Sequence, residues 1–278
     1  MMSESRESVE VTGARQNWKL VLAYDGSDFH GWQVQPDRPT IQGVLSDAIE
    51  RVVGERVLAQ GSGRTDAGVH SLGQVASFCL AAPIPPANLV RALNRTLPES
   101  IRVLAAEHAP PDFHARHSAM EKTYEYRIFR GEVCPPALAR YVYALNWPLD
   151  VQAMAHAASD ILGKHDFTSF AAADPDAGSR KADPPQDLDN VRTVRESFWT
   201  AEPERLTYRV TGSGFLHHMV RNLVGTFLDI GRSAMPAESI PGVLAARSRA
   251  AAGPTAPARG LFLVSVKYPK QPRLPQAD

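Results

Sequence analysis

Strand-like and helix-like segments alternate along this chain of 278 residues, and the pattern occurs once in each half. The strand-like segments are short and rich in β-branched and aromatic residues, and the helix-like segments repeat apolar residues every three or four positions. Each half is therefore expected to place its helices on one face of an antiparallel sheet. The pattern predicts an α+β fold with domains at 17–112 and 113–270, between flexible tails at 1–16 and 271–278.

Periodicity and breaking residues place the individual elements. The helix expected at 40–53 has one apolar face, and the helix at 87–97 follows two prolines and stops before Pro98. Further helices are expected at 150–162, 215–230 and 238–246, and strands at 19–24, 56–60, 74–80, 101–107, 122–129, 191–200, 205–211 and 261–268. The stretch 171–190 is rich in alanine, aspartate and proline without periodicity, which predicts an exposed loop.

Composition favours a globular cytoplasmic protein. Hydrophobic residues make up 44% of the chain. No apolar run approaches the roughly 18 residues that span a membrane, and the polar start does not fit a signal peptide. The two cysteines, Cys79 and Cys134, form no Cys-x-x-Cys pair, so we expect reduced thiols and no zinc site.

Positive charge is concentrated locally. Lys plus Arg and Asp plus Glu number 30 each, so the net charge gives no support for nucleic-acid binding. Between positions 91 and 130, however, cations are interleaved with aromatic residues; they are Arg91, Arg95, Arg102, Arg116, Lys122, Arg127 and Arg130. Such a surface suits phosphates and unstacked bases. The alternative is a solvated face beside core aromatics.

An aspartate in a glycine-rich loop is the strongest candidate for chemistry. Asp66 lies in Gly61-Ser62-Gly63-Arg64-Thr65-Asp66-Ala67-Gly68-Val69-His70, just before a strand-like run. Glycine permits tight turns and close approach to a ligand, and a carboxylate on such a turn can act as a nucleophile or base. An ordinary turn aspartate is the alternative. Because Asp66 occupies the third glycine position and no Gly-Lys-Ser/Thr follows, dinucleotide-binding and P-loop motifs are excluded.

Three other segments carry candidate residues. In the helix expected at 215–230, His218, Arg221, Asn222 and Gly225 share a face apart from the apolar one. Tyr124 lies in an alternating strand, so its ring either packs in the core or faces a ligand. The third segment is Ala256-Pro257-Ala258-Arg259-Gly260-Leu261-Phe262-Leu263, for which a plain turn into the last strand is the alternative. For Arg221 the alternative is a solvated side chain.

Taken together, the motifs resemble the TruA family of tRNA pseudouridine synthases. The matching residues are Tyr24-Asp25-Gly26, Phe29-His30-Gly31-Trp32-Gln33-x-Gln35, Gly63-Arg64-Thr65-Asp66-Ala67-Gly68-Val69-His70, Phe113-His114-Ala115-Arg116, Lys122-Thr123-Tyr124-x-Tyr126, His165-Asp166-Phe167-x-Ser169-Phe170 and Gly214-Phe215-Leu216-x-x-Met219-Val220-Arg221-Asn222. The resemblance covers nearly the whole chain, and the block around Asp66 is highly specific to that family.

The resemblance implies a pseudo-two-fold pair of ferredoxin-like domains with a cleft between them, a homodimer, and no metal or organic cofactor. It implies a tRNA substrate whose uridines at positions 38, 39 and 40 become pseudouridine. By motif position, Asp66 matches the family nucleophile and Arg221 the basic residue paired with it. Tyr124 matches the tyrosine that stacks on the target base. Arg64 matches an arginine that admits the flipped nucleotide, and Leu261 a leucine that lines the uracil pocket.

These residue types fit the implied reaction. Isomerisation breaks the C1′–N1 bond, turns the uracil and joins its C5 to C1′ without redox change or net hydrolysis, so neither a nicotinamide nor a metal is required. Asp66 can attack C1′ or remove the 2′ proton, and the sequence leaves both routes open. A nearby arginine favours the ionised carboxylate that both routes need.

Other functions remain as alternatives. An RNA-binding protein that lost catalysis is disfavoured because Asp66, Tyr124 and Arg221 are all present. A carboxylate-based N-glycosylase would release free uracil. A metal hydrolase is disfavoured because His217 and His218 are adjacent and lack the i, i+4 spacing of a helical zinc motif. The acidic loop at 171–190 departs from the family pattern, which leaves RNA contacts by this loop unsupported.

Overall fold

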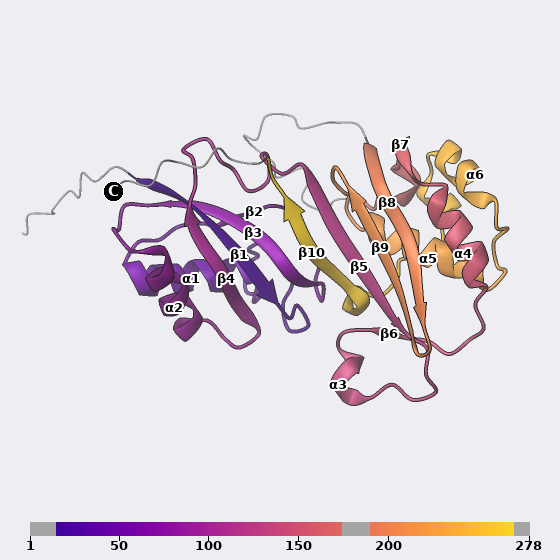
Figure 1. Cartoon of the computed structure of the whole chain (residues 1–278), viewed down its shortest axis with the longest axis horizontal. Coiled ribbons are helices and arrows are strands. Elements are labelled where there is room, and N and C mark those ends of the chain that lie inside the picture. Colours follow the sequence, from indigo (N-terminus) through magenta and orange to yellow (C-terminus); the bar gives the residue numbers. More distant parts are fainter. Residues whose placement is uncertain (1–14, 174–189, 270–278) are drawn as a thin grey trace, which may run out of the picture.

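The structure is a computed structural model that describes residues 15–173 and 190–269. The strands are β1 (Gln16–Tyr24), β2 (Gln60–Gly61), β3 (His70–Leu80), β4 (Ile101–His108), β5 (Glu121–Phe129), β6 (Tyr143–Ala144), β7 (Gly163–Asp166), β8 (Val191–Glu202), β9 (Arg205–Gly212) and β10 (Leu261–Lys267). The helices are α1 (Ile41–Val53), α2 (Pro86–Thr96), α3 (Pro136–Ala139), α4 (Val151–Ser159), α5 (Met219–Gly231) and α6 (Ser239–Ala246). One mixed sheet crosses the whole molecule in the order β4-β1-β3-β10-β5-β9-β8-β7 (Figure 1). The α+β class is therefore confirmed.

Helices of both halves cover the same face of this sheet. Strand pairing aligns Tyr24 with Ser71, Ser71 with Leu263, and Leu263 with Tyr124. Residues paired across strands point to the same face. Tyr24 belongs to the core cluster that contains residues of α1 and α2, and Leu263 and Tyr124 belong to the cluster that contains residues of α4 and α5. The two helical layers thus lie side by side on one continuous sheet (Figure 1).

Local caps set the helix ends. The Thr40 hydroxyl accepts a hydrogen bond from the Gly43 N–H, and Gly54 ends α1 with a left-handed φ of 72°. Asp150 caps α4 through the Ala153 N–H at 2.9 Å. The helix expected at 150–162 is α4, which begins after its cap, Asp150, and ends earlier than expected, at Ser159. No helix in the described ranges is long and apolar enough to cross a membrane.

The prediction of an antiparallel sheet was wrong at its centre. The last strand, β10, pairs parallel with β3 and antiparallel with β5. Since β3 and β5 run in opposite directions, a strand inserted between them must be parallel to one of them. The short strand β6 also pairs in parallel with β5. As a result, the C-terminal strand joins the two halves of the sheet through backbone hydrogen bonds.

A strand was expected at 56–60, but only Gln60 and Gly61 pair with β3. Side chains take the backbone groups that a longer strand would have used. The Glu55 carboxylate accepts from the Ala81 N–H, and the Gln42 amide donates to the Ala59 carbonyl. Most of the predicted loop at 171–190, and nearly all of the predicted tails at 1–16 and 271–278, lie outside the described residues.

Candidate active site

Asp66 lies in a loop between β2 and β3 that backbone hydrogen bonds hold on both sides. The Trp32 N–H donates to the Thr65 carbonyl at 3.0 Å, and the Val69 N–H donates to the Asp66 carbonyl at 3.1 Å. The hydroxyls of Tyr24 and Thr65 lie 2.9 Å apart. Contacts on Thr65 and on Asp66 itself therefore hold the backbone that carries the Asp66 side chain.

Gly26 and Gly31, from two motifs that precede this loop in the sequence, allow the backbone to pass close to it. Gly31 has a left-handed φ of 85°, and a Cβ atom there would lie 2.6 Å from the Thr65 carbonyl oxygen. A Cβ atom on Gly26 would lie 2.0 Å from the Val69 carbonyl oxygen. Real Cβ contacts are not that short, so the loop requires glycine at both positions.

Arg221 comes from the first turn of α5 in the other half of the sheet. Its Nη1 donates to Asp66 Oδ2 at 2.9 Å, and its Nε donates to the Ala256 carbonyl at 2.8 Å. The Ala256 N–H in turn donates to the Arg221 carbonyl at 3.1 Å. Only 14% of the Arg221 side chain is exposed, so the alternative of a solvated arginine is excluded. Charge-assisted hydrogen bonds of this kind are about twice as strong as neutral ones.

The helix that carries Arg221 begins later than the sequence predicted. It was expected at 215–230, but α5 starts at Met219 because His218 adopts a left-handed φ of 59°. The face expected to bear Arg221, Asn222 and Gly225 is also covered. Asn222 is fully buried and donates to the Phe170 carbonyl, and a Cβ atom on Gly225 would meet the Pro254 carbonyl oxygen at 1.6 Å.

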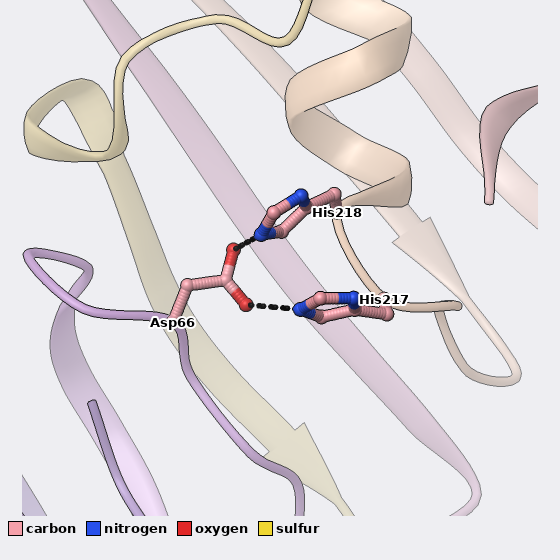
Figure 2. A group of neighbouring side chains, drawn as sticks. All are labelled: Asp66, His217 and His218. Atoms are coloured by element: carbon pink, nitrogen blue, oxygen red, sulfur yellow. Dashed lines mark ion pairs between the residues drawn. The ribbon is translucent and has the colours of Figure 1, made fainter. Parts of the chain in front are cut away.

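Two histidines that precede α5 also face Asp66 (Figure 2). The Nε2 atom of His218 lies 3.3 Å from Asp66 Oδ2, and that of His217 lies 3.7 Å from Oδ1. The two imidazole rings lie with their centroids 3.9 Å apart. Sequence reasoning considered the pair only as metal ligands, and placed His218 on a helix face with Arg221. Their place directly before Arg221 in one motif was the available signal.

Burial lowers the pKa of His218 below its ordinary value, and the cations His217, Arg221 and Arg249 lower it further. The Asp66 carboxylate opposes this shift without reversing it. His218 is therefore a neutral imidazole at neutral pH. Arg221 is the fixed positive charge against Asp66.

The same cluster offers three candidate metal ligands. One ligand atom from each of Asp66, His217 and His218 lies within 4.8 Å of the others. The fold thus brings the Asp66 carboxylate next to His217 and His218. The sequence analysis had judged the two histidines by their spacing alone. The Arg221 guanidinium already binds the Asp66 carboxylate at 2.9 Å, however, and would repel a cation placed there. The geometry fits a carboxylate held by an arginine better than a metal centre.

Tyr124 is buried, with 8% of its surface exposed, and packs edge-on against Phe215 with ring centroids 5.1 Å apart. Its hydroxyl forms no hydrogen bond with the described part of the chain. Burial raises the pKa of the hydroxyl, and Tyr24 and Asp66 raise it further. The ring therefore packs in the hydrophobic core, while its hydroxyl end lies near the Asp66 carboxylate.

Comparison with known proteins identifies the family. A family model described as tRNA pseudouridine synthase matches residues 20–118 and 157–269. The chain is 51% identical over 251 residues to tRNA pseudouridine synthase A of Solibacter usitatus (strain Ellin6076), covering 90% of this chain and 98% of that protein. It is 47% identical over 252 residues to the Moorella thermoacetica enzyme of the same name, again covering 90% and 98%. The chain belongs to the tRNA pseudouridine synthase family. The resemblance drawn from the motifs is thereby confirmed, and the chain is an isomerase.

In this synthase the structure brings together most, but not all, of the residues singled out from the sequence. Asp66 and Arg221 are in direct contact, and Tyr124 is close enough to Asp66 to feel its charge. Leu261 is buried at the start of β10, in the same core cluster as Tyr124. Arg64 is exposed on the Asp66 loop.

Proposed function

We propose that this synthase converts uridine to pseudouridine at positions 38, 39 and 40 of the tRNA anticodon arm. Asp66 is the catalytic carboxylate and Arg221 its fixed partner. The observation that carries the proposal is the 2.9 Å contact between Arg221 Nη1 and Asp66 Oδ2, made by residues from the two halves of the sheet. The names of the close relatives, tRNA pseudouridine synthase A, support tRNA as the substrate.

The contacts around Asp66 support an ionised carboxylate that acts without a cofactor. Either Asp66 attacks C1′ and N1 of the uracil leaves, or Asp66 removes the 2′ proton and a glycal forms. The freed uracil turns. In the first route C5 attacks C1′ and the Asp66–C1′ bond breaks; in the second route C5 bonds to C1′ and Asp66 returns the proton to C2′. In both routes C5 then loses its proton and N1 gains one, and the Tyr124 hydroxyl takes part in that last proton transfer.

The remaining candidates bind the substrate. The Tyr124 ring stacks on the target uracil, which must leave its stacked position at a cost of a few kcal/mol. Leu261 lines the uracil pocket; it lies opposite Tyr126 in β5, two residues from Tyr124. Arg64, exposed on the Asp66 loop, admits the flipped nucleotide.

We further propose that the two halves, 17–112 and 113–270, are ferredoxin-like domains related by a pseudo-two-fold, with the active-site cleft between them. The helical layers that each half places on the same sheet face support this reading. The protein acts in the cytoplasm as a homodimer. Sedimentation at micromolar concentration should give about twice 30.3 kDa. A monomer that is fully active on tRNA would refute the dimer.

The direct test is incubation with an unmodified tRNA transcript, followed by chemical mapping of pseudouridine. We expect modification at positions 38, 39 and 40 and no free uracil. Free uracil in the product would instead identify an N-glycosylase. Tight tRNA binding without either product would identify an RNA-binding protein and contradict the proposed reaction.

A further inference from the structure

Lys122 lies on the active-site face of the sheet, close to the Asp66 loop. It is two positions from Tyr124 in β5, so both side chains point to the same face about 7 Å apart. Its side chain crosses Gly63, where a Cβ atom would lie 3.0 Å from Nζ and 3.6 Å from Cε. The ammonium group of this half-buried lysine therefore lies beside Gly63, which precedes Asp66 by three residues in the chain.

This ammonium group has no anionic partner in residues 15–173 and 190–269, where no hydrogen bond or ion pair joins Lys122 to a carboxylate. Burial, together with the charges of Arg116 and Arg192, lowers the pKa of Lys122 to about 8. A half-buried cation is costly unless an anion joins it, and neighbouring positive charges add to that cost. Lys122 is only half-buried, so part of its side chain remains exposed to a ligand.

The surrounding cations come from separate segments of the chain. Arg192 belongs to β8, and its Cδ and Nε atoms lie 3.8 Å from the position of a Cβ atom on Gly214. Arg116 belongs to the loop before β5. Their convergence on Lys122 is therefore a product of the tertiary fold, and it creates positive potential next to the site of reaction.

We propose that Lys122, with Arg116 and Arg192 around it, binds a backbone phosphate of the RNA beside the nucleotide on which Asp66 acts. This inference rests on the proposed function, because it assigns a substrate contact to the same site. The phosphate supplies the anion that Lys122 lacks. The contact holds the RNA backbone beside the site, while Tyr124 holds the base.

The test compares Lys122→Met with wild type on unmodified tRNA. Methionine keeps the length of the side chain and removes the charge. We expect KM and the dissociation constant for tRNA to rise about tenfold, with kcat within about threefold of wild type. The slope of log K against log salt concentration should become shallower by about one, as expected for one lost phosphate contact.

Lys164→Met is the matched control, because Lys164 is exposed on the edge strand β7, three strands away from β5 (Figure 1). It should retain the wild-type salt slope. Thermal unfolding of Lys122→Met should occur at the same or a higher temperature than in wild type, because an unpaired charge has been removed. Wild-type KM and salt slope in Lys122→Met would overturn the inference. Weaker binding accompanied by a large fall in thermal stability would also overturn it, since Lys122 would then be structural. Failure of the proposed function is a separate result, in which the wild-type enzyme makes no pseudouridine.

Discussion

Arg221 Nη1 lies 2.9 Å from Asp66 Oδ2, although 155 positions separate the two residues in the chain. Asp66 is positioned by the loop before β3, and Arg221 by α5 and the Ala256 carbonyl. Strand β10 joins these two halves by pairing with both β3 and β5. The proposed catalytic pair therefore forms only when β10 has joined the two halves of the sheet.

Asp66→Asn should abolish isomerisation while tRNA affinity stays within a few fold of wild type. The amide keeps the size of the side chain but cannot act as nucleophile or base. Affinity depends mainly on phosphate contacts spread over a wider surface. Single-turnover assays and filter binding measure the two effects, with exposed Asp47→Asn on α1 as the control. Appreciable pseudouridine formation by Asp66→Asn would sink the assignment.

Arg221→Ala should reduce the rate of isomerisation about 10- to 100-fold, because a hydrogen bond to a charged group is worth about 1.5–3 kcal/mol. Arg221→Lys should lose less, since it keeps the charge but cannot bond both Asp66 and the Ala256 carbonyl. Single-turnover rates on tRNA compare the two variants with Arg56→Ala, a control whose side chain is 81% exposed. Equal rates for all three variants would show that the contact does not support catalysis.

Tyr124→Phe should keep the stability of the wild type within about 1 kcal/mol, because the hydroxyl has no hydrogen bond in the described part of the chain. Any loss of single-turnover rate in this variant then reports on the hydroxyl itself. Tyr124→Ala should lose about 3–5 kcal/mol of stability, because its 8%-exposed ring fills core space. If the alanine variant lost stability but kept near-normal chemistry, the stacking role on uracil would be wrong.

Gly31→Ala should destabilise the protein by at least about 1–2 kcal/mol and lower kcat. Its φ of 85° disfavours a side chain, and its Cβ atom would collide with the Thr65 carbonyl next to Asp66. Gly242→Ala in α6 is the control, since a Cβ atom there meets nothing within 4 Å. That control should be neutral or stabilising by up to about 1 kcal/mol. Thermal melts and single-turnover rates would decide, and an unaffected Gly31→Ala would show that the loop has room to move.

Lys122 should make stability depend on pH above neutrality. Its pKa is lowered from 10.5 to about 8 in the folded protein, so between these values the unfolded chain binds more protons. The free energy of unfolding should therefore rise with pH across that window through this group. Lys122→Met lacks this contribution, so its stability advantage over wild type should be present below pH 8 and vanish towards pH 10.5. Urea unfolding of both proteins at several pH values measures the difference, and a constant difference would contradict the shift.

Local sequence patterns predicted much of the fold and the acidic member of the site. Thr40 and Gly54 bound α1 near its expected ends because capping is a short-range interaction. Asp66 could be selected because its glycine-rich loop is contiguous in the chain. The strand expected at 56–60 does not form because side chains take the backbone groups that it would pair. Gln42 donates to the Ala59 carbonyl, and Glu55 accepts from the Ala81 N–H.

The sequence by itself determined the element types, the family and the identity of Asp66 as the central carboxylate, because motifs and periodicity are properties of contiguous residues. Only the tertiary structure decided that β10 lies between β3 and β5, and that His217 and His218 face Asp66. It also decided that Lys122, which has no anionic partner among the described residues, lies beside the loop that carries Asp66. These facts depend on which distant segments the shared sheet brings together. No local pattern encodes that arrangement, because the free energy that fixes it comes from burial across the whole sheet.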